Sequence, residues 1–169
     1  YRDGVLRESG IYAKGKRNST FTEYYQDGVT PRKETPMQQG KIDGTVKTYF
    51  RNGKIEAEKE YKQSVESGRE RRFDSKTGEQ IFESHYIDGK KDGEEWEIFE
   101  DASTLRSRII RHYRNGKLDG SYRVESTRDG KPYITIEGQY TDGEKSGQWI
   151  EHNYDNNTQT CTWHGEGGA

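Results

Sequence analysis

The sequence predicts an all-β protein, an elongated single-layer antiparallel β-meander of about six hairpin repeats. Three observations predict it: the composition, a Tyr-Gly phrase that recurs at a nearly constant interval, and the β-forming segments between its copies. Only 27% of the 169 residues are hydrophobic, whereas 34% are charged and 12% are aromatic. A two-layer core normally needs more apolar residues, while Tyr can pack its ring and leave its hydroxyl in water. The composition therefore favours a thin, widely exposed β structure.

The charge and the cysteine count exclude several other classes. A net charge of -2 lacks both the repulsion that keeps a disordered chain expanded and the basic surplus typical of nucleic-acid binding. The single cysteine, Cys161, excludes an internal disulfide framework and a multi-cysteine metal site. No apolar run approaches the roughly 20 residues of a membrane-spanning helix. We therefore expect no nucleic-acid partner and no cofactor.

A phrase of the form Tyr-x-x-Gly-x-x-x-Gly sets the repeat. Its first residues, called anchors below, recur at steps of 25, 24, 25, 27 and 27 residues. The anchors are Tyr12, Met37, Tyr61, Tyr86, Tyr113 and Tyr140. Of the twelve positions three and seven residues after an anchor, ten are glycine, and Ser19 and Ser64 occupy the other two. Because turn backbones visit positive φ, where a side chain clashes, the sequence predicts one repeat array over 1–169 with turns at these glycines.

Each repeat is predicted to hold two strands joined by a further turn. The first strands are the β-rich segments that follow the second glycine, at 21–25, 46–50, 96–99, 121–124 and 149–154. The second strands lead into the next anchor, at 54–61, 80–86, 108–113 and 133–140. The turns between the two are predicted at 26–28, 51–53, 76–78 and 128–130. A last strand is predicted at 158–163 with Trp163 in the anchor place, a looser loop at 101–108, and the closing turn of an upstream hairpin at 1–4.

The phrases Y86-I-D-G-K-K-D-G93, Y113-R-N-G-K-L-D-G120 and Y140-T-D-G-E-K-S-G147 resemble the MORN repeat in its bacterial variant. The resemblance covers nearly the whole chain and departs from the pattern at Met37, at Ser19 and within 61–68. It implies a sheet of MORN-like hairpins with a non-catalytic role in protein-protein scaffolding, and in some members membrane association. Bacterial proteins of this kind look like antitoxin or immunity partners of toxins and are similar to surface or periplasmic lipoproteins. The resemblance thus favours the periplasm or cell envelope over the cytoplasm.

The residues show no convergent catalytic or metal-binding set. His85 and His112 each precede an anchor by one residue, which puts them two strands and about 10 Å apart, too far for shared metal ligation. The three carboxylates within 56–60 share one strand face, and we expect them to face solvent and the basic residues of 69–72 rather than to form an acid/base pair. We therefore expect no metal site and no enzymatic activity.

The run L105-R-S-R-I-I-R-H-Y-R114 is the densest basic segment. It has two interpretations. The run could contact lipid phosphate or an acidic protein patch, or it could balance Glu94, Glu95 and Glu97 on the preceding strand of the same hairpin. The second interpretation is favoured, because it suits a sheet surface on which the charges alternate in sign.

Exposed aromatic rows with arginine nearby are the predicted binding surface. A single layer cannot bury both faces, and Trp, Tyr and Arg are the residue types that anchor protein interfaces. The main hypothesis is that the chain binds another protein, a cognate toxin or effector, and blocks it by steric occlusion. The alternative is a scaffold at a membrane or lipid surface. The candidate binding residues are Tyr86, Trp96, Arg111, Tyr113, Tyr122, Tyr140 and Trp149.

Overall fold

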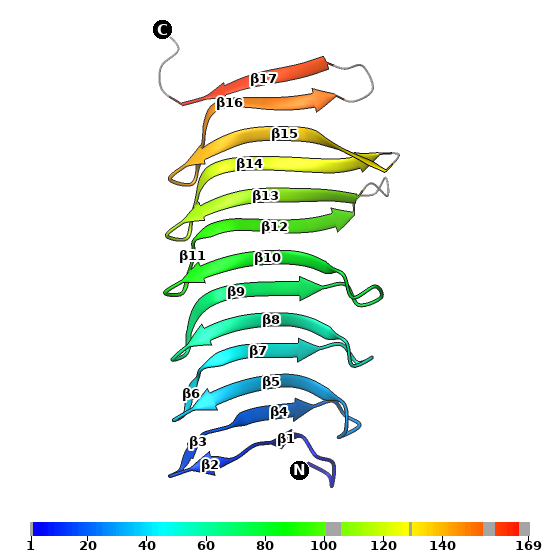
Figure 1. The fold of residues 1–169 in the computed structure, drawn as a ribbon, viewed down its shortest axis with the longest axis vertical. Helices are drawn as coiled ribbons and strands as arrows, with labels where there is room; N and C mark the ends of the chain where they lie inside the picture. The colour runs from blue at the N-terminus through cyan, green and yellow to red at the C-terminus, as the bar shows by residue number, and fades with distance from the viewer. Residues whose placement is uncertain (1, 101–105, 129, 154–157, 166–169) are drawn as a thin grey trace. The chain divides into compact units, whose positions relative to one another are not determined.

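A computed structural model describes residues 2–100, 106–128, 130–153 and 158–165 (Figure 1). The predicted fold class is confirmed: these residues are all-β, and nearly all their strands belong to an antiparallel meander. They include no helix long and apolar enough to cross a membrane. The chain divides into two compact units, residues 1–90 and 91–169, which are described separately. Because the boundary falls inside the repeat that begins at Tyr86, one continuous array over 1–169 stays a prediction.

In the first unit the strands follow one another across the sheet in chain order, β1-β4-β5-β7-β8-β9-β10. Two short strands form a separate hairpin, β2-β3, and β6 pairs with β5. The bounds are β1 (Glu8–Ser9), β2 (Tyr12–Ala13), β3 (Lys16–Arg17), β4 (Thr20–Tyr24), β5 (Pro31–Gln38), β6 (Lys41–Ile42), β7 (Gly44–Tyr49), β8 (Ile55–Lys62), β9 (Val65–Phe73) and β10 (Gln80–Ile87).

The second unit contains the longer strands of the meander, in the order β12-β13-β14-β15-β16-β17. Strand β11 (Lys90–Lys91) lies at the boundary between the units. All six strands lie side by side in one layer (Figure 1). Their bounds are β12 (Gly93–Glu100), β13 (Arg106–Arg114), β14 (Lys117–Arg128), β15 (Lys131–Thr141), β16 (Glu144–Asn153) and β17 (Thr158–His164).

The strands predicted from the β-rich segments are confirmed within the described residues, but several observed strands were not predicted: the long strands β5 and β9 and the two-residue strands β1, β2, β3, β6 and β11. Strand β5 contains two prolines, Pro31 and Pro36, and β9 reads V-E-S-G-R-E-R-R-F, so neither has the apolar alternation that marks a strand in sequence. Residues 101–105 of the predicted loop lie outside the described residues. Residues 106–108 belong to β13, which corrects the end of that prediction.

The first glycine of the phrase lies in a two-residue hairpin turn, as predicted. Arg114 pairs with Lys117, and the two residues between them, Asn115 and Gly116, have φ of 50° and 86°. Positive φ at both central residues defines a type I′ turn, whose twist matches that of the strands. The turn backbone is also tied to the preceding repeat, because the Gly116 amide donates to the Lys91 carbonyl at 2.8 Å.

The second glycine does not form a turn, which corrects the prediction for that position. Gly120 lies inside β14 with φ of 118°, next to a shift in the β13–β14 register between Arg111 and Tyr113. A Cβ on Gly120 would lie 3.0 Å from the Cβ of His112. Only three residues separate Gly120 from the type I′ turn, too few for another reversal, so the chain forms a β-bulge that bends the strand.

Part of the thin core lies at the position nine residues after an anchor, which is buried in five of the six repeats and half-buried at Tyr122; Phe82, Ile110 and Val124 are buried at other positions. In the first unit this position holds Phe21, Val46 and Glu70, which are 2%, 9% and 8% exposed. In the second unit Glu95 and Trp149 are 1% and 5% exposed. The core position is thus aromatic or aliphatic in some repeats and a buried carboxylate in others, so ion pairs replace apolar packing in the latter.

The prediction that Trp163 takes the anchor place is wrong. Tyr113 pairs with Gly93 and Tyr140 pairs with Gly120, so each of these anchors pairs with the second glycine of the preceding phrase. The residue that pairs with Gly147 in the same way is His164, whose ring lies 6.2 Å from that of Trp149. Trp163 is one residue earlier, so it points to the opposite face of β17 and is 75% exposed.

Candidate functional site

The second unit has two faces of different character. Cross-strand partners project to the same side of a sheet, so the register assigns each side chain to a face. The face we call the aromatic face carries the row Glu95, Arg111, Tyr122 and Gly138, together with Trp149. The face we call the hollowed face carries the row Trp96, Ile110, Arg123, Glu137 and Ile150.

Three of the predicted binding residues form one cluster on the aromatic face. The ring centroids of Tyr122, Tyr140 and Trp149 lie 5.2–5.7 Å apart. The Trp149 indole donates to the Gln139 carbonyl at 3.1 Å, and the Lys145 Nζ lies 4.1 Å from its ring centroid. These rings therefore pack mainly on one another and on the chain itself.

Two more predicted residues on this face are engaged in ion-pair clusters. Arg111 lies 3.2 Å from a carboxylate oxygen of Glu95 and 2.9 Å from one of Glu97, as the balancing interpretation of the basic run predicted. The Tyr113 ring lies under Lys91, whose Nζ is 4.9 Å from its centroid and also contacts Glu95. Trp96, by contrast, lies on the hollowed face, and Tyr86 belongs to the first unit. A binding role for the seven residues stays a prediction.

In the first unit, Tyr86 closes a cluster around the buried Glu70. Its hydroxyl donates to Glu70 at 3.0 Å, and Lys59 and Arg72 contact the same carboxylate at 3.0 and 2.8 Å. Burial of Glu70 would raise its pKa, but the hydrogen bonds from Arg72 and Lys59 outweigh burial and hold it below the ordinary 4.5. Burial and the Glu70 charge raise the pKa of Tyr86 to about 12. The Tyr86 hydroxyl therefore stays protonated and completes the cluster.

The lowered pKa of Glu70 predicts acid sensitivity. A carboxyl with a depressed folded-state pKa stabilises the fold above its unfolded pKa, and this contribution is lost as the pH falls through the folded value. We expect the Glu70→Gln variant to unfold at a lower urea concentration than the parent at pH 7, and the difference between their urea midpoints to close as the pH falls below the ordinary carboxyl pKa of 4.5. Urea unfolding followed by far-UV circular dichroism measures it. Glu56→Gln, at an exposed position of β8, is the control; a gap that persists unchanged at pH 2 contradicts the prediction.

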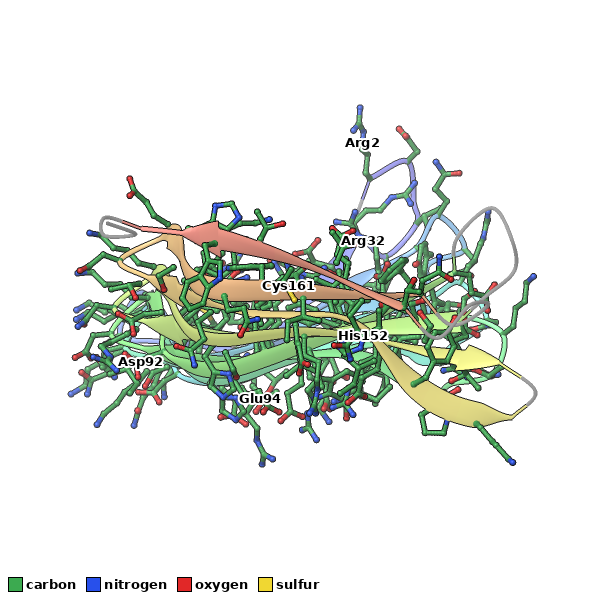
Figure 2. The ribbon with its side chains drawn as sticks, turned by 90° about the horizontal axis from the view of Figure 1, so that it is seen from above. Arg2, Arg32, Asp92, Glu94, His152 and Cys161 are labelled. Atoms are coloured by element: carbon green, nitrogen blue, oxygen red, sulfur yellow. The ribbon has the colours of Figure 1, made fainter. Side chains whose placement is uncertain are left out.

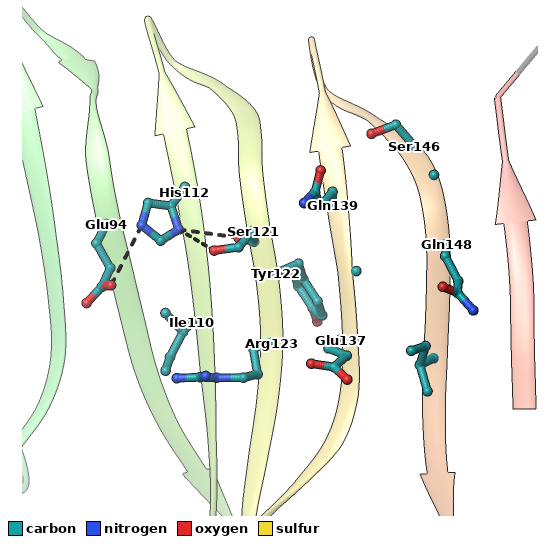
Figure 3. Close-up of a pocket in the computed structure, with 13 residues that line it drawn as sticks. Glu94, Ile110, His112, Ser121, Tyr122, Arg123, Glu137, Gln139, Ser146 and Gln148 are labelled. Carbon is teal, nitrogen blue, oxygen red and sulfur yellow. Dashed lines mark hydrogen bonds and ion pairs between the residues drawn. The ribbon is translucent and has the colours of Figure 1, made fainter. Parts of the chain in front are cut away.

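The hollowed face contains a shallow trough of ≈ 530 Å³ across five neighbouring strands, β12 to β16 (Figure 3). Its lining mixes polar and charged side chains with the apolar Ile110 and Ile150. Of the seven predicted binding residues, Tyr122 lines this trough; the other lining residues were not predicted, because the candidates were chosen from aromatic rows with arginine nearby. The lining includes Glu94, Ile110, His112, Ser121, Arg123, Glu137, Gln139, Gln148 and Ile150.

Three trough residues form a carboxylate–imidazole–hydroxyl row. The Ser121 Oγ lies 2.9 Å from the His112 Nδ1, and the His112 Nε2 lies 3.7 Å from a Glu94 oxygen (Figure 3). This order occurs in nucleophilic catalysis, which also needs hydrogen-bond donors aimed at the developing oxyanion. Ser121 pairs with Gln139 of β15, lies in the register shift on the β13 side, and belongs to an open surface on which the His112 and Glu94 side chains are 37% and 49% exposed. The row is better suited to hydrogen bonding with a bound surface than to acyl transfer.

A second hollow of ≈ 270 Å³ lies on the same face and is lined in part by Ile98, Arg108 and Glu125. Charges on this face are interspersed: Arg123 lies 2.8 Å from Glu125, and His152 lies 3.0 Å from Glu137. Figure 2 shows Glu94 and His152 on the same side of the sheet. The face is therefore wide, open and mixed in polarity.

No group of three or more His, Cys, Asp or Glu side chains within the described ranges is placed to hold a metal ion. No protein-family model matches the chain, and no curated protein matches its sequence. The resemblance to the MORN repeat therefore rests on the phrases of this chain alone.

Proposed function

We propose that this chain is a non-catalytic protein-binding repeat protein that contacts its partner through the hollowed face of the second unit. One observation carries the proposal: the trough is wide, shallow and mixed in polarity, and it draws its lining from five adjacent strands. Small-molecule sites are typically concave and mostly apolar, whereas non-obligate protein interfaces are mixed in polarity and spread over many residues. The trough has the second character.

The partner class follows from the resemblance to bacterial MORN-variant proteins. We propose a toxin or effector, blocked by steric occlusion because a sheet that covers the active surface of a partner needs no chemistry of its own. A membrane surface is the competing target. The interspersed carboxylates Glu94 and Glu137 in the trough favour protein, because they would repel an anionic lipid headgroup.

A matched pair of charge-introducing variants tests this proposal. Gln139 lies exposed in the trough, and Glu151 lies exposed on the opposite face of the neighbouring strand. With the partner captured from the source organism and purified, we expect Gln139→Arg to raise the dissociation constant at least tenfold and Glu151→Arg to change it less than threefold, since loss of one central contact costs about 1.4 kcal/mol or more. Isothermal titration calorimetry measures both constants.

The reverse order of effects would place the interface on the aromatic face. Binding of the parent to phosphatidylserine vesicles, with no protein captured, would instead support the membrane alternative.

A further inference from the structure

Unlike Arg111 and Arg114, Arg108 pairs with no carboxylate among the residues that the structure describes. In the same basic run, Arg111 contacts Glu95 and Glu97, and Arg114 lies 3.4 Å from Asp119. The guanidinium of Arg108 makes no ion pair with any residue that the structure describes, and its Nε, like that of Arg111, is buried without a hydrogen-bond partner there. A buried donor left unsatisfied is costly, so it calls for an explanation.

The nearest carboxylate by register is already used. Glu125 is the cross-strand partner of Arg108, yet it lies 2.8 Å from Arg123 on its own strand. Arg108 instead lies over the Trp96 ring, with its guanidinium carbon 4.5 Å from the ring centroid. Stacking on an indole holds the planar guanidinium in place.

This stacked pair lies in the part of the hollowed face where a partner would reach it. Arg108 lines the smaller hollow together with Ile98 and Thr127, and Ile110, two residues along β13, lines the trough. Trp and Arg are the residue types most enriched among the dominant contacts of protein interfaces. Of the candidates chosen from the sequence, Trp96 lies on this face by register, and Tyr122 is among the residues that line the trough.

We propose that the Arg108–Trp96 pair is an anchor for an acidic side chain of the protein partner, an Asp or Glu whose carboxylate accepts from the Arg108 guanidinium. The inference rests on the proposed function and adds the chemistry of the contact. A planar carboxylate matches the guanidinium fork. The adjacent Glu125 favours a singly charged carboxylate over a doubly charged phosphate, which it would repel more strongly.

Selection of a displayed random-peptide library against the intact chain tests the anchor. We expect the selected peptides to be enriched in Asp or Glu and to lose binding about 10- to 100-fold on Arg108→Gln, the range for hydrogen bonds to charged groups. Arg108→Lys keeps the charge without the fork, and we expect a smaller loss, about three- to tenfold. Arg114→Gln removes an exposed arginine of the same strand and is the control, expected to be neutral.

A second readout uses the unaltered protein, so it does not depend on the folding of a variant. Titration with acetyl-Gly-Glu-Gly-amide is expected to shift the NMR signals of the Arg108 Nε–H and the Trp96 indole N–H, and the Gln-containing peptide is expected not to. Equal shifts with both peptides, selected peptides without acidic enrichment, or indifference to Arg108→Gln would each overturn the anchor. If the captured partner still responds to Gln139→Arg but not to Arg108→Gln, the proposed function stands and this inference fails.

Discussion

Replacing Gly138 with alanine is expected to lower the free energy of unfolding of the second unit by about 2–3 kcal/mol, the upper range for overpacking. A Cβ at this position would lie 2.3 Å from Cδ2 and 2.5 Å from Cε2 of Trp149. The indole cannot retreat easily, because it is 5% exposed, is hydrogen-bonded to the Gln139 carbonyl and packs against Tyr122 and Tyr140.

Tryptophan fluorescence during urea unfolding measures this effect cleanly, since all three tryptophans, Trp96, Trp149 and Trp163, belong to the second unit. A double-mutant cycle supplies the control. In a Trp149→Leu background the added methyl meets a smaller side chain, so the penalty of Gly138→Ala should fall by more than half. An equal penalty in both backgrounds would show that the cost arises from the backbone and not from the indole.

The second large effect is expected at Glu95, whose side chain is 1% exposed. It contacts Lys91 and Arg111, so Glu95→Gln leaves two cations facing a neutral amide. Breaking a buried ion pair by removing one partner costs about 3–5 kcal/mol. Because Lys91 and Arg111 keep some contact with water, we expect about 2–3 kcal/mol here, measured as a lower urea midpoint by tryptophan fluorescence.

Glu97→Gln is the matched control. Glu97 lies two residues further along β12 and contacts the same Arg111 at 2.9 Å, but its side chain is 43% exposed. Exposed ion pairs contribute at most about 1 kcal/mol, so we expect a change within that limit. Similar losses for the two variants would mean that burial of Glu95 is not what makes its contacts important.

The repeat could be predicted from the sequence because its signals are local. The Asn115–Gly116 turn needs only two residues that tolerate positive φ between two β-forming segments, and those residue types are visible in the chain. The wrong prediction of a turn at the second glycine also came from a local signal. Gly120 carries the same Asp-Gly signal as a turn, and only its place in β14, opposite His112, shows that it forms a bulge.

The candidate site could not be predicted from local sequence signals, because it depends on the face of the sheet to which each side chain points. Glu95 and Trp96 are neighbours in sequence, yet one is the buried centre of an ion-pair cluster and the other lies under Arg108 on the opposite face. A shift of one residue in register exchanges the two faces, and the bulges introduce such shifts at β13–β14 and β15–β16. The candidate binding residues, chosen by residue type, therefore came from both faces of the sheet.

The sequence by itself determined the all-β class, the hairpin period and the turn at the first glycine of each phrase, because these depend on the φ preferences and side-chain alternation of a few consecutive residues. Only the tertiary structure decided that His164 rather than Trp163 takes the last anchor place, that Glu95 is buried, and that Arg108 pairs with no carboxylate among the described residues. Those outcomes depend on cross-strand register and on competition between neighbouring charges, which arise only when strands distant in sequence pair.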